Sequence, residues 1–230
     1  MNPMQQKKIR KIPAAVFSAL SSMRLLCWMP DRLYLSAMWR AHFHQKLDWK
    51  NPRTFNEKLQ WLKAYDHNPA YPAMVDKFAV RRLIADMIGE EYLIPLAGGP
   101  WNSFDEIDFD LLPESFVLKC THDSGGVIIC RDKNALDRKA AKKKMEQCLR
   151  RNYYWGGREW PYKNIRPQII AETYMESGPG SELKDYKFMM FGGEHRCAFV
   201  CSNRFAGSKL NVTFFDPGWN RMPFERHYHA

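Results

Sequence analysis

The sequence lacks long hydrophobic runs, paired cysteines and biased tracts, and each absence excludes a class of protein. The most apolar stretch, residues 14–29, is interrupted by Arg24 and by small or polar residues, so it falls short of a membrane-spanning helix. The six cysteines form no CxxC pair and no Cys/His cluster with zinc-ligand spacing, which favours reduced, buried thiols. A membrane bundle, collagen, a coiled coil and a disulfide scaffold are therefore excluded.

The composition is that of a globular protein with an excess of positive charge. With 230 residues, of which 45% are hydrophobic, the chain can form one large or two small domains with their own cores. Lysine and arginine outnumber aspartate and glutamate by 35 to 25, a net charge of +10. This excess indicates an anionic partner without naming it.

The positive charge is concentrated in two regions. Residues 1–50 hold nine basic and two acidic side chains, residues 138–166 hold ten and two, and residues 101–137 hold three and eight. Such patches suit phosphate-bearing ligands, a membrane surface or RNA, and solvated helix faces are the alternative. Because no aromatic residue interleaves the basic stretch before Tyr153, we expect no nucleic-acid partner.

The N-terminal region carries a basic cluster followed by an apolar segment. Lys7, Lys8, Arg10 and Lys11 precede residues 14–29, and no small-residue cleavage signature follows. We therefore expect a cytoplasmic protein that lies against the inner face of the membrane through this amphipathic start.

The first half of the sequence predicts helices. Apolar spacing indicates helices at residues 14–29 and 31–44, separated by Pro30, with Asp31 capping the second. A Thr-x-x-Glu capping box at residues 54–57 opens a third, and a fourth is predicted over residues 74–88, ended by Gly89. Residues 92–96 then read as a short strand and residues 98–100 as a turn.

The second half predicts strands with one inserted helix, at residues 137–151. The strands are expected at residues 116–120, 127–130, 168–175, 186–191, 196–202 and 212–215. This order predicts an α+β fold, in which N-terminal helices are followed by mixed or antiparallel sheet subdomains.

One stretch has the composition of a phosphate clamp. Lys119 ends a strand, the loop Ser124-Gly125-Gly126 follows, and the chain then returns as a second strand. A lysine ammonium attracts phosphate oxygens, and glycine lets backbone N–H groups approach them. The loop is neither a Walker A motif nor a dinucleotide-binding fingerprint. The alternative is an ordinary hairpin whose Lys119 points to solvent.

Several blocks together resemble a known family. From about residue 30 onward the sequence resembles the TupA-like ATP-grasp family of bacterial cell-surface polysaccharide and teichuronopeptide genes, whose members are often labelled glycosyltransferases. The blocks that carry the resemblance are Pro52-Arg53-Thr54-Phe55-Asn56-Glu57-Lys58-Leu59-Gln60-Trp61-Leu62, Asp76-Lys77-Phe78-Ala79-Val80-Arg81, Phe116-Val117-Leu118-Lys119, His122-x-Ser124-Gly125, Glu159-Trp160-Pro161-Tyr162 and Asp185-Tyr186-Lys187-Phe188.

The resemblance implies an ATP-grasp enzyme, in which two α+β subdomains hold ATP. Such an enzyme activates a carboxylate as an acyl phosphate and passes it to an amine, here on a glycan or peptide acceptor. It also implies a helical region at residues 1–70, the start of the first subdomain at 71–115, the lysine strand, glycine loop and basic helix at 116–166, and a second subdomain at 167–230.

The resemblance also implies roles for individual residues. Lys77 and Lys119 match the phosphate-binding lysines, and Ser124, Gly125 and Gly126 match the loop that closes on the phosphates. Glu172 and Tyr174 lie where the family holds adenine, and Asp185 and Lys187 lie near the expected ribose and phosphates. Arg204 resembles a phosphate-contacting position and is predicted to be catalytic together with Lys119. From the residues alone, Lys77 could instead pair with Asp76, and Asp185 with Lys187.

The sequence departs from the family at its C-terminal end. The family's magnesium-binding block, an Arg-x-Asp strand followed by a Glu-x-Thr-Phe segment, has no match here, and Asp216 and Glu225 are the only late acids. We therefore expect ATP as ligand, with most Mg²⁺ ligands missing, no metal site within this chain, and a second subdomain that is incomplete.

Two other functions remain open at this point. A glycosyltransferase would use a sugar nucleotide and an Asp-x-Asp metal motif, and the nearest string, Asp108-Phe109-Asp110, reads as a surface turn. A non-enzymatic remnant or basic binding module would need no catalytic residues. The ATP-grasp interpretation accounts for the most residues, and it leaves catalytic competence undecided.

Overall fold

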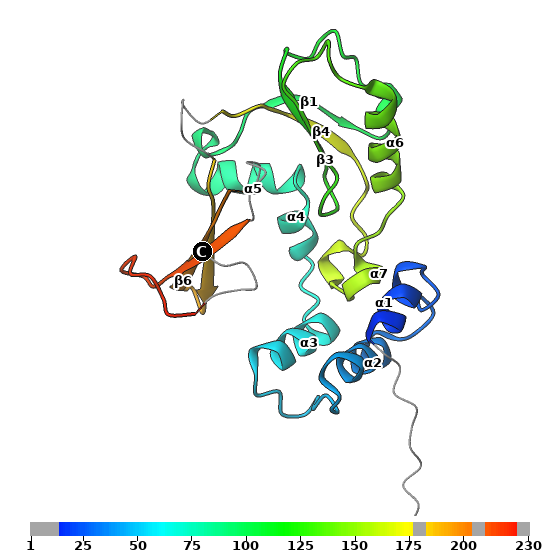
Figure 1. Cartoon of the computed structure of the whole chain (residues 1–230), viewed down its shortest axis with the longest axis vertical. Coiled ribbons are helices and arrows are strands. Elements are labelled where there is room, and N and C mark those ends of the chain that lie inside the picture. Colours follow the sequence, from blue (N-terminus) through cyan, green and yellow to red (C-terminus); the bar gives the residue numbers. More distant parts are fainter. Residues whose placement is uncertain (1–13, 177–182, 204–209, 225–230) are drawn as a thin grey trace, which may run out of the picture. The chain divides into compact units, whose positions relative to one another are not determined.

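The computed structural model describes residues 14–176, 183–203 and 210–224. These form two compact units, Met1–Tyr174 and Met175–Ala230, which are described one at a time (Figure 1). The two units meet between Tyr174 and Met175, and the four regions implied by the resemblance, 1–70, 71–115, 116–166 and 167–230, stay predictions. Helices followed by two antiparallel sheets confirm the predicted α+β class.

The first unit begins with three helices, α1 (Ala14–Ser22), α2 (Asp31–Phe43) and α3 (Phe55–Tyr65). Their small core is formed by Phe17, Tyr34, Leu35 and Ala41. The predicted capping box of α3 is confirmed, because the Glu57 N–H donates to Thr54 Oγ1 over 3.3 Å and the Glu57 carboxylate accepts from the Thr54 N–H over 2.8 Å.

Two predictions at the start of the chain are wrong. The first helix ends at Ser22 rather than at residue 29, because Arg24 adopts a left-handed conformation with φ of 60° and turns the chain. Asp31 does not cap α2, since Pro30 occupies the N-cap position. The Asp31 carboxylate instead lies 3.3 Å from the Arg158 guanidinium.

The helix predicted over residues 74–88 is interrupted. The structure has α4 (Tyr71–Val75) and α5 (Ala79–Ile88), with a break between them. At the break, the Asp76 carboxylate accepts from the N–H groups of Phe78 (2.8 Å) and Ala79 (3.1 Å), as a capping residue does. The Lys77 N–H leaves the helical path and donates to Thr121 O over 3.0 Å.

The sheet of the first unit contains four antiparallel strands in the order β1 (Leu96–Trp101), β4 (Ile169–Thr173), β2 (Phe116–Cys120) and β3 (Val127–Cys130). The strand predicted at residues 92–96 and the turn predicted at 98–100 are wrong. A 3-10 turn, η1 (Glu90–Tyr92), precedes β1, and β1 runs through Gly98-Gly99-Pro100. Glycine is needed there because a Cβ on Gly99 would lie 2.9 Å from Ile169 O.

One face of this sheet is covered by α6 (Arg138–Leu149) and by η2 (Phe104–Glu106), as Figure 1 shows for α6. The Asp137 carboxylate caps α6 by accepting from the Ala140 N–H over 2.9 Å. The buried residues of α6 are Ala141, Met145 and Cys148, and they pack with β2 in the main core of the unit. After α6, the chain forms α7 (Tyr154–Gly157) and η3 (Trp160–Tyr162) before it enters β4.

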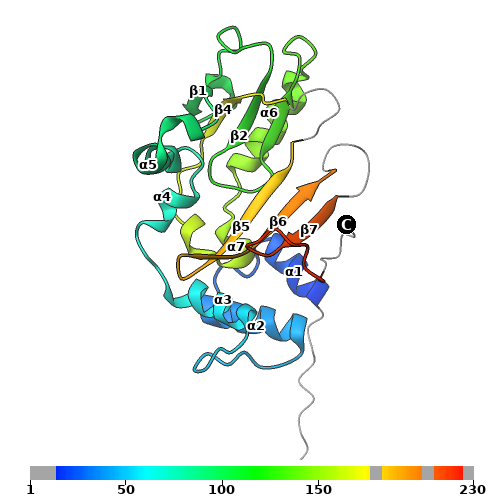
Figure 2. The same cartoon turned by 90° about the vertical axis from the view of Figure 1, so that its left-hand side faces the viewer.

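The second unit is a three-stranded antiparallel sheet in the order β5 (Asp185–Phe191), β6 (Glu194–Ser202) and β7 (Asn211–Phe215), seen side by side in Figure 2. The predicted strands at residues 186–191, 196–202 and 212–215 are confirmed. Gly192 and Gly193 form the β5–β6 turn with φ of 58° and 84°, a conformation that favours glycine. None of the helices in the described part of the chain is long and apolar enough to cross a bilayer.

Candidate functional site

Lys119 lies on the face of the sheet opposite α6. Along β2, Phe116, Leu118 and Cys120 are buried in the core, so the alternation of a strand places Val117 and Lys119 on the other face. Val117 is paired with Glu172 of β4, which puts Glu172 on this same face. The Lys119 ammonium makes an ion pair with the Glu172 carboxylate, so the alternative of a lysine pointing to solvent is wrong.

The buried Glu172 carboxylate is shared by two cations. Besides Lys119, the Arg81 guanidinium of α5 lies 3.7 Å from it. Arg81 is fixed by a second contact, a hydrogen bond of 2.7 Å to Ile94 O. One carboxylate therefore faces two positive charges, with one cation at each of its oxygens.

Lys77 joins the break between α4 and α5 to the β2–β3 loop. Its ammonium donates to Cys120 O over 2.9 Å and also to Asp123 O. Burial lowers the pKa of Lys77, the Asp123 carboxylate opposes this, and the nearby charge of Lys119 adds to the lowering. The alternative of an ion pair with Asp76 is not what the structure shows. The Lys77 ammonium instead donates hydrogen bonds to main-chain carbonyl oxygens at the loop.

The loop has a buried base and an exposed tip. At the base, Thr121 N–H donates to Gln168 O over 2.9 Å, and His122 Nε2 lies 3.2 Å from Cys148 O and 3.0 Å from Arg151 O. Since both of those partners accept, His122 Nε2 carries the proton. Ser124 and Gly125 at the tip are exposed. The loop can therefore present its tip to a ligand without losing its anchors.

Gly125 and Gly126 are required for different reasons. Gly125 has φ of 99°, where a side chain is strained. Gly126 is buried, and a Cβ there would lie 2.7 Å from the Asp123 carboxylate and 2.9 Å from Cys120 Cβ. The Gly126 N–H donates to Asp123 Oδ1 over 3.3 Å. This packing holds the loop against β2.

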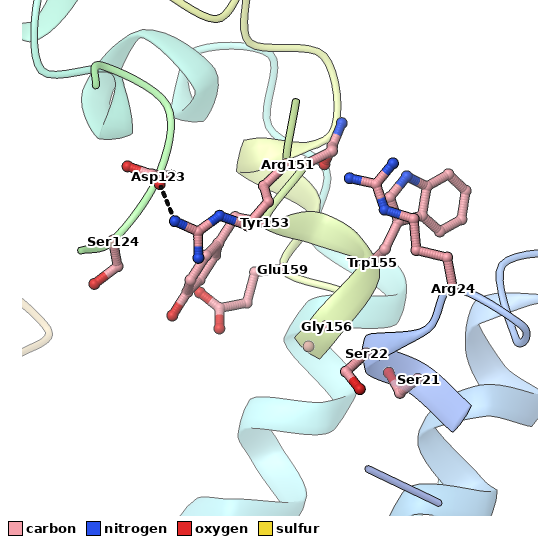
Figure 3. Close-up of a pocket in the computed structure, with 12 residues that line it drawn as sticks. Ser21, Ser22, Arg24, Asp123, Ser124, Arg151, Tyr153, Trp155, Gly156 and Glu159 are labelled. Carbon is pink, nitrogen blue, oxygen red and sulfur yellow. Dashed lines mark ion pairs between the residues drawn. The ribbon is translucent and has the colours of Figure 1, made fainter. Parts of the chain in front are cut away.

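A cavity of ≈ 440 Å³ opens beside the loop (Figure 3). Asp123 and Ser124 lie on one side, Ser21, Ser22 and Arg24 at the end of α1 on the other, and residues of α7 lie between them. The Arg151 guanidinium points toward Asp123, with 3.7 Å between the charged atoms. The cavity thus combines guanidinium groups, hydroxyls and aromatic rings next to the candidate phosphate loop.

A second cavity, of ≈ 520 Å³, brings together two of the sequence blocks quoted above. It is lined by Leu59, Leu62, Lys63, Asp66, Tyr71, Glu159, Trp160 and Pro161. Trp160 stacks on His67 with 4.8 Å between ring centroids. Burial lowers the pKa of Lys63, which Glu159 partly opposes. Of the block Glu159–Tyr162, Glu159 lines both cavities, so this residue lies between them.

The other predicted site residues lie elsewhere or outside the described part. Tyr174 follows β4 directly, and its hydroxyl accepts from Arg131 Nε over 3.0 Å. Asp185 and Lys187 lie on β5 of the second unit and pair over 2.9 Å, as the alternative from the sequence had it. Arg204 lies outside the described residues. The roles of all four stay predictions.

Three charged residues of the site escaped the sequence analysis. Arg81 and Asp123 both lie within the sequence blocks that carry the family resemblance. Their closeness in sequence to Lys77 and Ser124 was the signal that could have identified them as site residues. Arg151 follows the end of α6 by two residues, and only the fold brings it to the loop. Asp123 is buried and forms the acceptor around which the loop is built.

The carboxylates of the first unit do not fit a magnesium site. Glu172 and Asp123 are each engaged by cations, and no group of three His, Cys, Asp or Glu side chains within the described ranges is arranged to hold a metal. Asp108 and Asp110 flank the buried Phe109, and the Asp110 N–H donates to Asp108 Oδ1 over 3.0 Å. This confirms the prediction of a turn.

The comparison with family models identifies this chain as an ATP-grasp protein. The family model described as "TupA-like ATPgrasp" matches residues 57–230, which is well over half of the chain. The chain belongs to the TupA-like ATP-grasp family, as the resemblance in its sequence blocks predicted. Membership of this family implies ATP binding. Comparison with curated proteins and with solved structures gave no match.

Proposed function

We propose that this protein binds ATP through Lys77, Lys119 and the Ser124–Gly126 loop and acts as an ATP-dependent carboxylate–amine ligase in cell-surface polysaccharide biosynthesis or modification. The observation that carries the proposal is the convergence of these residues, from the α4–α5 break and the β2–β3 hairpin, at one end of the four-stranded sheet. Family membership supports the same ligand.

The charge balance of the site favours a polyanion. Lys77, Lys119, Arg81 and Arg151 lie near three carboxylates, those of Glu172, Asp123 and Asp76, so that cations still outnumber carboxylates. Half-buried cations with too few counter-charges are stabilised when an anion arrives, because the anion replaces lost hydration. A triphosphate supplies that charge, and the exposed N–H groups at the loop tip add hydrogen bonds.

The protein's part in the reaction is to position and to neutralise charge. Phosphoryl transfer to a carboxylate needs the triphosphate held in line with the attacking oxygen and its developing charge compensated. Lys119 supplies a mobile ammonium whose present partner, Glu172, also has Arg81. Exchange of Lys119 from Glu172 to phosphate would therefore leave the carboxylate paired.

The cavity of ≈ 440 Å³ is the proposed place for the acceptor. It adjoins Ser124, and Arg24 and Arg151 offer guanidinium groups that match a carboxylate. Tyr153 and Trp155 add aromatic surface for the rest of a glycan or peptide.

Calorimetry with ATP, in the presence of magnesium, tests the nucleotide site. We expect micromolar binding by the full chain and a loss of roughly tenfold to hundredfold in Lys119→Ala, as for a charge-assisted phosphate contact. Lys139→Ala is the matched control, because Lys139 is an exposed lysine on α6 outside the site. Equal affinity in the two variants, or no binding by the folded wild-type chain, would contradict the proposal.

A trapping assay tests the ligase step. An acyl phosphate reacts with hydroxylamine, forming a C–N bond to give a hydroxamate and releasing phosphate. With ATP, hydroxylamine and cell-envelope carboxylates, we expect hydroxamate and ADP in equal amounts. ATP binding without ADP release would limit the function to nucleotide binding. Binding of a UDP-sugar in place of ATP would instead support a glycosyltransferase.

A further inference from the structure

The turn between α1 and α2 exposes large apolar side chains. Trp28 is 78% exposed and Leu25 is 55% exposed, and Met23 is exposed beside them. The Trp28 indole N–H donates to Leu25 O over 3.0 Å, so the only polar atom of this side chain is satisfied within the turn. What Trp28 presents to its surroundings is therefore apolar ring surface.

The turn is held in this conformation by contacts on its inner side. Leu26 and Met29 pack against the core of the helical layer, and Leu26 O accepts from the buried Arg158 over 2.8 Å. The Arg24 guanidinium donates to Arg150 O over 2.7 Å. Because Arg24, Leu26 and Met29 are held by these contacts, the side chains of Leu25 and Trp28 stay on the outer side of the turn.

The sequence up to the end of this turn carries charge of one sign. Residues 1–30 contain five basic side chains (Lys7, Lys8, Arg10, Lys11 and Arg24) and no acidic one. Leu33, in the first turn of α2, is also exposed and extends the apolar surface along the chain. Exposed aromatic and aliphatic side chains within a basic segment match the two parts of an anionic bilayer, its acyl region and its headgroups.

We propose that this turn docks on an anionic lipid surface, with Met23, Leu25 and Trp28 entering the interface and the positive charge of the N-terminal sequence adding electrostatic attraction. Trp is suited to this depth because its ring is large and amphipathic. A few apolar side chains or a basic segment alone bind weakly, and the two together give stable, reversible attachment.

The position of Arg24 relates the docked turn to the acceptor cavity, and this step rests on the proposed function. Arg24 stands between Met23 and Leu25 in sequence and lines the cavity that Ser124 adjoins. A bilayer at the turn would therefore lie close to the proposed acceptor cavity. An acceptor attached to the membrane could then enter the cavity while ATP enters from the sheet side.

Vesicle flotation tests the docking with the full chain. The probes are vesicles of phosphatidylcholine alone and of phosphatidylcholine mixed with phosphatidylglycerol, at low and high salt. We expect binding to the mixed vesicles, and a loss of about tenfold or more in the double variant Leu25→Ser/Trp28→Ser, because two buried apolar side chains are removed. The matched control is Leu111→Ser/Met87→Ser, at residues that are 81% and 69% exposed on other elements.

Each outcome decides the proposal. Absence of vesicle binding, equal binding by both double variants, or binding abolished by salt alone would overturn it. Self-association without vesicles that only Leu25→Ser/Trp28→Ser removes, with no flotation, would assign the surface to a second copy and also overturn it. ATP titration of the same variant separates the two hypotheses, since the docking residues are not part of the nucleotide site.

Discussion

Two groups of charged side chains in the first unit use the same chemistry in opposite ways. Around Arg158, which is 1% exposed, one cation faces one carboxylate, that of Asp31 at 3.3 Å. The guanidinium also donates to Leu26 O over 2.8 Å and lies 4.4 Å from the Tyr34 ring centroid. Around Glu172, cations outnumber carboxylates. Balanced charge is typical of a structural contact, whereas a surplus of positive charge favours the binding of an anion.

The two groups also differ in what they join. Arg158 connects α7 to α1 and α2, and its guanidinium lies over the rings of Tyr34, Tyr154 and Trp155. The group around Glu172 connects α5 to the sheet and leaves Lys119 partly exposed. Removing one cation should therefore be costly in the first group and mild in the second.

The largest effect is expected from Arg158→Met. It leaves the Asp31 carboxylate without its buried partner, so the free energy of unfolding should fall by about 3 kcal/mol. Arg81→Met is the matched comparison and should cost about 1 kcal/mol, because Lys119 still pairs with Glu172. Urea unfolding midpoints of both variants measure the difference. Equal losses would show that the two groups are alike.

An intermediate effect is expected from alkaline pH. Burial and the hydrogen bond to Asp31 raise the pKa of Tyr154 to about 12. An unfolded tyrosine ionises near pH 10, so between these values the folded chain binds more protons and the free energy of unfolding falls as pH rises. Tyr154→Phe should lose stability at neutral pH and show a weaker alkaline decline, by about 1.4 kcal/mol between about pH 8 and about pH 11. Urea midpoints at about pH 8 and about pH 11 test this, and parallel declines in both proteins would contradict it.

The smallest effect is expected from Glu172→Gln. The change leaves Lys119 and Arg81 near each other without a counter-charge and should cost about 1 kcal/mol. Added tripolyphosphate should raise the melting temperature of this variant more than that of wild type, since the anion supplies what the carboxylate did. If tripolyphosphate raised both melting temperatures equally, the surplus charge would not be the feature that attracts the ligand.

Local patterns were sufficient for much of the fold. The capping box at Thr54, the strand β2 and the helix α6 depend on neighbours in sequence, and each was predicted. The α+β order followed from them. The two lysines and the glycine loop of the candidate site also stood out, because their residue types suit phosphate.

Predictions failed where a distant contact decided the local structure. The helix over residues 74–88 breaks because the Lys77 N–H bonds to Thr121 O, far along the chain. Gly98–Pro100 forms strand instead of turn because β4 approaches it closely. Asp31 was expected to cap a helix, but its carboxylate pairs with Arg158, a buried residue more than a hundred positions along the chain. Similarly, Arg151 reaches the loop only through the position of α6.

Lys77 has one more consequence for how the first unit moves. Its main-chain N–H bonds to Thr121 O, and its ammonium spans Cys120 O and Asp123 O. The break between α4 and α5 is thus fastened to the loop at three points, and neither can open without the other. The two segments form one cooperative opening unit, and a phosphate that draws the Lys77 ammonium away would loosen the helix break and the loop base in a single event.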